Sequence, residues 1–133
     1  MIQIRPLQES DLPTVVQQSR DVAGGDAREA AWFRTHETLV AVEGQEVVGH
    51  TSWTPCDGYT LWDETVVAPA HRGQGIGRVL MDARAERTPG RVFGACRPDN
   101  APMVHLLETL GFARVQTVER GYDGHPAWIW ERA

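Results

Sequence analysis

The sequence contains no lysine, and all 13 of its basic side chains are arginines. A Walker-type phosphate loop requires Gly-Lys followed by Ser or Thr, so this chain cannot form one. Acidic side chains number 18 and the formal net charge is −5. This balance argues against a general nucleic-acid binder, which needs a basic face to displace counterions.

Cysteines and long apolar segments are scarce as well. Cys56 and Cys96 form no CxxC pair and have no histidine at ligand spacing, so we expect reduced thiols and no metal site. No apolar run approaches the roughly 20 residues of a membrane span. The first residues lack the basic and apolar regions of a signal peptide. We therefore expect a cytoplasmic protein that does not enter a membrane.

Strand and helix signals alternate over the 133 residues, which is the length of one domain, so we expect a single domain over 1–133. Apolar alternation and turn residues predict strands over 2–6, 38–43, 46–54, 59–68, 91–96, 112–120 and 127–131. Helices are predicted after a cap at Ser10, over 26–36 after the break at Gly24-Gly25, from Gly75 onward, and after a cap at Asn100. Antiparallel hairpins followed by a β-α-β crossover indicate an α/β protein with a mixed sheet and helices on both faces.

The most informative segment joins the strand over 59–68 to the following helix. Gly73, Gly75 and Gly77 lie within five positions, and glycine lets the backbone turn sharply and approach a ligand closely. The unpaired N–H groups at the start of a helix attract an anion, which predicts a phosphate cradle. The alternative is a plain tight turn, for which one glycine would be enough. A dinucleotide fingerprint fails because the position that requires its third glycine holds Leu80.

Two motifs resemble those of the GNAT N-acetyltransferase superfamily. Residues 72–77 read Arg-Gly-Gln-Gly-Ile-Gly and match its R/Q-x-x-G-x-G/A motif, and Val67-Ala68-Pro69 is similar to its V-x-P lead-in. Asn100, followed by Leu-Glu-Thr-Leu-Gly-Phe over 107–112, is similar to its second motif. The order of elements also agrees, so the resemblance covers essentially the whole chain.

The resemblance implies a central mixed sheet of six to seven strands with about four helices, splayed at the central strand. It also implies acetyl-CoA as the cosubstrate. Backbone groups of Val66, Val67 and Ala68 would pair with the pantetheine arm, and the N–H group at or near Val67 would polarise the thioester carbonyl. Asn100 would approach the pantetheine arm, cap its helix, or do both. The N–H groups that would hold the pyrophosphate belong to Arg72, Gly73, Gln74, Gly75, Ile76, Gly77 and Arg78.

The acid and the base are less well defined. Glu64 and Asp63 lie in a largely apolar strand and point to opposite faces, so at most one faces the cleft. We favour Glu64 slightly as the base, with Asp63 close behind; the alternative is that both are structural, ion-paired carboxylates. Many family members place a tyrosine acid four residues before the glycine of Gly-Phe, where this chain has Leu107. The sequence therefore leaves the acid unassigned.

The sequence thus predicts an acetyl-CoA-dependent N-acetyltransferase that acts on a primary amine of a small molecule or a protein. The alternative, suggested by Leu107, is a non-catalytic acyl-CoA-binding sensor or regulatory module. We expect no nucleic-acid partner. The final hairpin and the exposed strand edges are compatible with a homodimer. Trp53, Trp62 and His50 are expected to be structural residues of the sheet.

Overall fold

A computed structural model describes residues 1–23, 27–122 and 124–133, without the side chains of Ala23 and Tyr122. The α-helices are α1 (Leu12–Ala23), α2 (Ala30–Thr35), α3 (Ile76–Arg87) and α4 (Ala101–Thr109). The strands are β1 (Ile2–Pro6), β2 (Glu37–Glu43), β3 (Glu46–Cys56), β4 (Tyr59–Val67), β5 (Val92–Cys96), β6 (Ala113–Tyr122) and β7 (His125–Arg132). Short 3-10 turns lie at Glu9–Asp11 and Pro69–His71. In the described part of the chain, no helix is long and apolar enough to cross a membrane.

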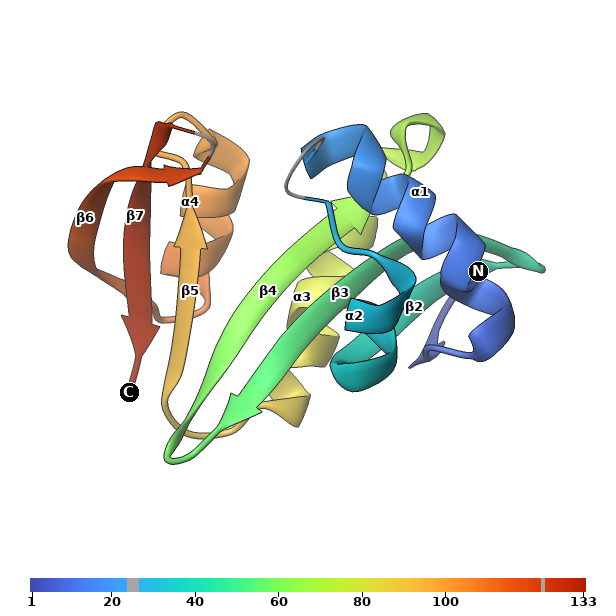
Figure 1. The fold of residues 1–133 in the computed structure, drawn as a ribbon, viewed down its shortest axis with the longest axis horizontal. Coiled ribbons are helices and arrows are strands. Elements are labelled where there is room, and N and C mark those ends of the chain that lie inside the picture. The colour runs from blue at the N-terminus through green and yellow to red at the C-terminus, as the bar shows by residue number, and fades with distance from the viewer. Residues whose placement is uncertain (24–26, 123) are drawn as a thin grey trace. The chain divides into compact units, whose positions relative to one another are not determined.

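The strands follow the hydrogen-bonded order β1-β2-β3-β4-β5-β7-β6 (Figure 1). The β1–β2, β2–β3, β5–β7 and β6–β7 pairs are antiparallel, whereas β4 and β5 are parallel. Seven strands in a mixed sheet with four helices confirm the predicted fold class. The chain divides into two compact units, one of Met1–Thr54 with Glu64–Arg87 and one of Pro55–Asp63 with Thr88–Ala133.

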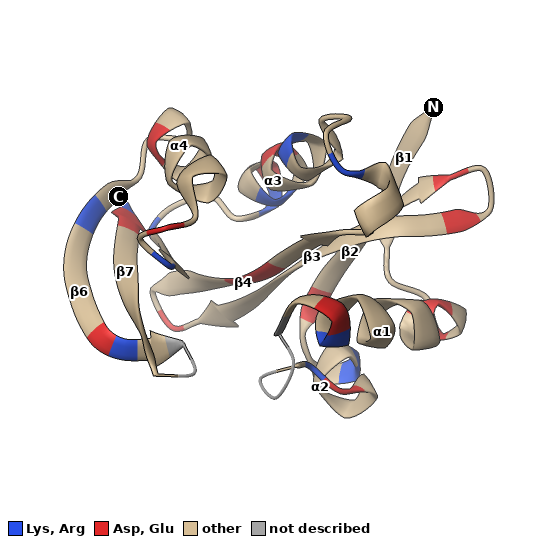
Figure 2. Ribbon diagram, turned by 90° about the horizontal axis from the view of Figure 1, so that it is seen from above, with Lys and Arg blue, Asp and Glu red and all other residues tan. Residues whose placement is uncertain are grey.

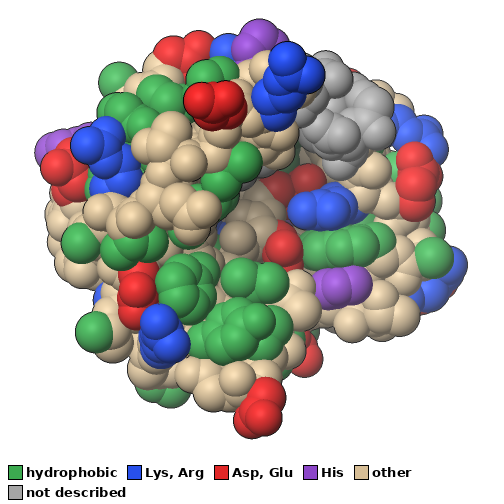
Figure 3. Space-filling model, turned by 60° about the vertical axis from the view of Figure 1, so that its left-hand side comes forward, with side chains coloured by type: hydrophobic (Ala, Val, Ile, Leu, Met, Phe, Trp, Pro, Cys, Tyr) green, Lys and Arg blue, Asp and Glu red, His purple; other side chains and the backbone are tan. Residues whose placement is uncertain are grey.

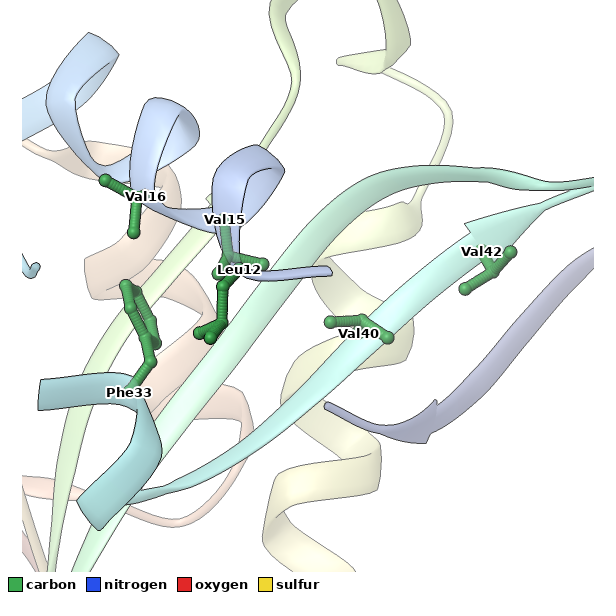
Figure 4. Packing of buried hydrophobic residues seen from close by; sticks show 6 residues of the cluster. All are labelled: Leu12, Val15, Val16, Phe33, Val40 and Val42. Carbon is green, nitrogen blue, oxygen red and sulfur yellow. The ribbon is translucent and has the colours of Figure 1, made fainter. Parts of the chain in front are cut away.

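In the first unit, helices cover both faces of the strands. Figure 2 shows α1 and α2 on one face of β2 and β3, and α3 on the other. Under α1 and α2, a cluster of buried side chains joins both helices to β2 (Figure 4); its members are Leu12, Val15, Val16, Phe33, Val40 and Val42. Under α3, a second cluster consists of Ala41, Val48, Ile76 and Leu80. Apolar side chains on both faces explain why β2 is buried along nearly its whole length.

A β-bulge in β3 sets the orientation of the residues that follow it. Val42 faces Val47 and Ala41 faces Gly49, so Val48 is the extra residue in this strand. A Cβ atom at Gly49 would lie 2.8 Å from the Val66 carbonyl oxygen, so only glycine fits without a shift of the backbone. Beyond the bulge, His50 points toward α1 and α2, where it contacts Gln18 and Phe33.

In the second unit, β5, β7 and β6 form an antiparallel ladder next to the first part of β4. The parallel ladder of β4 with β5 consists of Thr60–Val92 and Leu61–Phe93. A Cβ atom at Gly94 would touch the side chains of Trp62, Leu107 and Phe112, so α4 packs over the middle of β5. The predicted splay concerns the placement of the two units and stays a prediction.

Several predicted details were wrong. Ser10 does not cap α1: it lies in the 3-10 turn, where the Gln8 N–H group donates to the Asp11 carboxylate at 2.7 Å. The helix predicted over 26–36 begins only at Ala30, because the Arg28 N–H group donates to Ser19 Oγ at 2.8 Å instead of joining a helix. Gly24, Gly25 and Asp26 lie outside the described residues. The helical spacing from Ile76 also predicts Val79 on the buried face of α3, but Val79 is 43% exposed.

Candidate functional site

The glycine-rich segment forms a tight turn that leads into α3. Gly73 and Gly75 have φ angles of 79° and 81°, in the left-handed region that L side chains rarely adopt. The first bond of the helix runs from the Val79 N–H group to the Gly75 carbonyl oxygen at 3.1 Å. The N–H groups before Val79 therefore have no carbonyl within the helix, and they carry the positive end of its dipole. The turn is suited to bind an anion.

The third glycine has a different role from the other two. Gly77 lies within α3, outside the left-handed region, and a Cβ atom there would meet only Val67 Cγ2 at an ordinary 3.7 Å. The fold therefore tolerates a side chain at this position. No contact within the described part of the chain requires glycine at position 77. A ligand that lies close to the start of the helix would require it.

The other residues of the predicted cradle divide between core and surface. Ile76 is 2% exposed and anchors the start of α3 in the core. Gln74 is exposed. Arg78 is half-exposed and pairs with Asp82 at 3.0 Å, while Arg72 Nε donates to the Val67 carbonyl oxygen at 3.0 Å. Both arginines stand beside the turn, as predicted, although each already has a partner within the chain.

The end of β4 orients its backbone groups. The Ala68 N–H group donates to the Val48 carbonyl oxygen on β3 at 2.8 Å, and the Ala68 carbonyl accepts from the His71 N–H group at 2.9 Å. Because backbone groups of successive residues in a strand point to opposite sides, the Val67 N–H group points away from β3. Of Val66, Val67 and Ala68, it is Val67 that offers an N–H group on that side.

Asn100 is confirmed as the cap of α4. Its side-chain oxygen accepts from the Met103 N–H group at 3.3 Å, and Pro102 lies in the first turn. The amide group of Asn100 is exposed, so it retains donors for a second partner. Its contact with the pantetheine arm stays a prediction.

Glu64 lies in a polar cluster between β4, β3 and α1. Its carboxylate accepts from Ser19 Oγ at 2.9 Å and lies 2.5 Å from His50 Nε2. The Glu64 side chain is 15% exposed, whereas that of His50 is fully buried. Asp63, the neighbouring carboxylate, points to the other face by strand alternation. The structure therefore brings Glu64 together with His50, a titratable partner, on the α1 side.

Sequence reasoning missed the role of His50 and Gln18 in this cluster. His50 was expected to be a structural residue of the sheet, but its contact with Glu64 was not foreseen. One partial signal was present: positions 50 and 64 lie on two strands joined by the turn at Asp57-Gly58, although strict counting from that turn puts them on opposite faces. Gln18 gave no such signal, because it approaches His50 only through the packing of α1 on the sheet.

The remaining candidates are structural. Leu107 is 2% exposed and belongs to the core of the second unit, as expected. Trp53 and Trp62 are buried as well. Burial raises the pKa of the Cys96 thiol, so the thiol stays protonated.

Charged side chains are mixed over the surface. On the face shown in Figure 3, basic side chains lie scattered among acidic ones. On the ribbon in Figure 2, acidic residues mark the β2–β3 hairpin, which carries Glu43 and Glu46 on either side of its turn.

Comparisons with known proteins show the family and the fold of this chain. The sequence model of the acetyltransferase (GNAT) family matches residues 2–112. The streptothricin acetyltransferase of Streptomyces lavendulae is 33% identical over 113 residues, which cover 76% of this chain and 58% of that protein. The chain thus spans less than two thirds of the length of this relative.

Solved structures share the fold. The ribosomal-protein-S18-alanine N-acetyltransferase of Escherichia coli superposes with a TM-score of 0.82 at 21% identity, covering 98% of this chain and 92% of that one. yncA of Salmonella typhimurium, described as a putative acetyltransferase and solved with its cofactor acetyl-CoA, gives a TM-score of 0.82 at 18% identity. The superposition covers 99% of this chain and 93% of that one.

Proposed function

The chain belongs to the GNAT acetyltransferase family, and we propose that it transfers an acetyl group from acetyl-CoA to a primary amine of a small molecule or a protein. The observation that carries this proposal is the turn from β4 into α3. Gly73 and Gly75 adopt left-handed conformations there, and Gly77 leaves the start of the helix uncovered. In this proposal residues 1–133 act as one acyl-CoA-binding domain.

The residues of the turn fit the pyrophosphate of acetyl-CoA. The N–H groups from Arg72 to Arg78 supply donors and the positive end of a helix dipole, which suits a doubly charged anion. A Cβ atom at Gly73 or Gly75 would meet no atom within 4 Å, so the space beside the turn is open. Arg72 and Arg78 add positive charge next to it. Asn100 would donate its exposed amide to the pantetheine arm.

Val67 is proposed to polarise the thioester carbonyl. Its N–H group points away from β3, while the N–H group of Ala68 is already bonded within the sheet. A fixed backbone donor stabilises the negative charge that develops on the carbonyl oxygen during acyl transfer. Val66 and Ala68 hold Val67 in place on the two sides.

Glu64 is proposed as the base that prepares the amine. An ammonium group must lose a proton before its nitrogen can attack, and the electron pair of that N–H bond stays on nitrogen. The nitrogen then forms a bond to the acetyl carbon, and the C–S bond breaks with its electron pair on sulfur. A second proton from the nitrogen neutralises the thiolate, so amide and thiol are the products. Asp63 is the alternative base.

The acceptor is proposed only as a class, a primary amine. The two named relatives point to different acceptors: one is named for the small molecule streptothricin and the other for the alanine of a ribosomal protein. We further propose a cytoplasmic location, no nucleic-acid partner in view of the net charge of −5, and a homodimer formed through the final hairpin.

A second candidate function is a non-catalytic acyl-CoA-binding module. The observation in its favour is Leu107, a buried apolar residue where many family members have a tyrosine acid. Thiol release from acetyl-CoA, measured across polyamines, aminoglycosides, amino acids and peptide N-termini, separates the two. Turnover with any amine supports the acetyltransferase. Tight CoA binding without turnover would support the module, and absence of CoA binding would contradict both.

A further inference from the structure

The His50 ring lies between two hydrogen-bond acceptors. Its Nδ1 atom is 2.8 Å from Gln18 Oε1, and its Nε2 atom is 2.5 Å from Glu64 Oε2. The ring is fully buried, so water does not compete for either nitrogen. A neutral imidazole has one N–H donor, and it can satisfy only one of these two contacts.

Gln18 determines which ring nitrogen must carry a proton. Its Nε2 group donates to the Val47 carbonyl oxygen at 3.1 Å, which fixes the orientation of the side-chain amide. Gln18 Oε1 therefore faces His50 Nδ1 and accepts a hydrogen bond from it. With the Nδ1 proton engaged, the contact between His50 Nε2 and Glu64 needs a second proton.

Without that second proton, the lone pair of His50 Nε2 and the Glu64 carboxylate would face each other at 2.5 Å. Two acceptors at this distance repel each other, whereas one shared proton gives a short, charge-assisted hydrogen bond. We propose that His50 and Glu64 share one proton as a coupled pair, and that this pair, not Glu64 alone, accepts the proton of the amine substrate. The inference rests on the proposed acetyltransferase function and gives His50 the part of a positioning residue.

Among the residues described in contact with the His50 ring, Glu64 is the titratable group. In the described part of the chain, α1 contributes the neutral Gln18 and Ser19, α2 contributes the Phe33 ring with a centroid distance of 5.4 Å, and β2 places Val40 opposite His50. In the segment before α2, Arg28 donates its backbone N–H group to Ser19, and its guanidinium lies over the Trp32 ring, 4.6 Å from the centroid. The proton of the pair is therefore governed by the contact between His50 and Glu64.

The difference in burial shows how protons reach the pair. The Glu64 side chain is 15% exposed and that of His50 is not exposed, so exchange takes place at Glu64. The pair must first lose its proton to solvent. It then takes a proton from the ammonium group of the substrate, and the electron pair of the broken N–H bond stays on nitrogen. The pair thereby returns to the form in which His50 and Glu64 share one proton.

Nuclear magnetic resonance tests the pair in the free protein, without turnover. The chain has five histidines, and selective ¹⁵N labelling of their rings yields resonances that His50→Gln assigns by the loss of one set. We expect a strongly deshielded proton on the His50 ring at low pH. We also expect the Nε2 shift to change when the pair loses its proton.

The pH dependence of kcat/KM tests the role of the pair in catalysis. In the unmodified protein kcat/KM should rise with pH along one limb that coincides with the titration of the Nε2 shift. His50→Gln keeps a donor toward Glu64 but removes the ring that shares the proton, and should move the limb to lower pH. Ser52→Ala is the matched control: it removes a buried hydroxyl on β3 that bonds Thr38, and it should leave the limb in place.

The outcomes separate this inference from the proposed function. Ring nitrogen shifts of a neutral imidazole for His50 at every pH would overturn the shared proton, and so would an unmoved limb in His50→Gln. If His50→Gln does not fold, the titration of the unmodified protein decides. If the Nε2 shift titrates but no amine is acetylated, the shared proton stands and the acetyltransferase proposal fails.

Discussion

Single residues of the turn before α3 serve two different purposes. Gly73 and Gly75 are required by the backbone, because their φ angles lie in the left-handed region. Gly77 is not required by the backbone, since a Cβ atom there makes only an ordinary contact with Val67. The spacing of the glycines predicted a cradle, but it could not show that the third glycine differs from the other two, because φ angles depend on how the helix begins.

This difference predicts distinct effects of alanine at the two kinds of position. Gly77→Ala should leave the stability unchanged and weaken CoA binding at least about tenfold, because its methyl group would occupy the space of the pyrophosphate. Gly75→Ala should cost about 1–2 kcal/mol of stability as well, because of left-handed strain. Calorimetric titration with CoA and urea unfolding measure the two effects.

The control for strain is Gly44→Ala in the β2–β3 turn, where φ is 64° and no atom would lie within 4 Å of the new Cβ. It should lose similar stability without loss of CoA binding. Equal CoA affinity in Gly77→Ala and the unmodified protein would contradict the assigned cradle.

Glu64 is the second residue with a specific prediction. Glu64→Gln removes the base but retains an acceptor for Ser19, so kcat should fall by about 10²–10⁴-fold while CoA binding is unchanged. Asp63→Asn is measured alongside under the same conditions. A larger loss in Asp63→Asn than in Glu64→Gln would assign the base to Asp63.

At the scale of elements, the cap of α4 was predicted correctly because an N-cap is a local feature. Asn100 precedes Pro102 in a pattern that needs no tertiary contact. The start of α1 was predicted less well. There the capping contact comes from Asp11, whose carboxylate is held by Arg5 of β1, and a partner from another element is not visible in a local pattern.

Two substitutions at Asn100 separate its role as a cap from its role in CoA binding. Asn100→Ala should lower the free energy of unfolding by about 1 kcal/mol through loss of the cap. Asn100→Asp keeps the cap but lacks the amide donors, so it should retain stability and bind CoA more weakly. Unchanged CoA affinity in Asn100→Asp would show that Asn100 caps α4 but does not contribute to CoA binding.

The contact between β1 and the start of α1 gives a prediction about pH. Hydrogen bonds from the Arg5 guanidinium lower the pKa of Asp11 below its ordinary 3.8; burial opposes them, and the Gln8 N–H group adds to the lowering. Because the pKa is lower in the folded protein, the stabilisation is present above about pH 3.8 and is lost as the pH falls through the folded value. Asp11→Asn lacks this contribution at every pH.

Urea unfolding at neutral and at acidic pH measures this effect. The difference in stability between the unmodified protein and Asp11→Asn should be large at neutral pH and should shrink in acid. A difference that does not depend on pH would show that the ion pair with Arg5 makes no net contribution.

At the scale of the whole molecule, element order and fold class could be predicted, whereas the polar cluster around Glu64 could not. The spacing of apolar residues within short segments predicts strands and helices. The two motifs indicate the order of elements on either side of the turn. The contact of Gln18 with His50 joins residues 32 positions apart in the chain, and it depends on how α1 packs over the bulged β3. The acceptor amine is not encoded in either motif.

We propose that this chain binds acetyl-CoA at the turn over residues 72–78 and transfers its acetyl group to an amine. Mass spectrometry of the amine panel after incubation with acetyl-CoA, with free thiol measured in parallel, tests this function most directly. We expect one N-acetylated product formed in equal amount to the CoA released, and loss of both in Gly77→Ala at subsaturating acetyl-CoA. Tight acetyl-CoA binding with neither acetylated amine nor free thiol would contradict the proposed function.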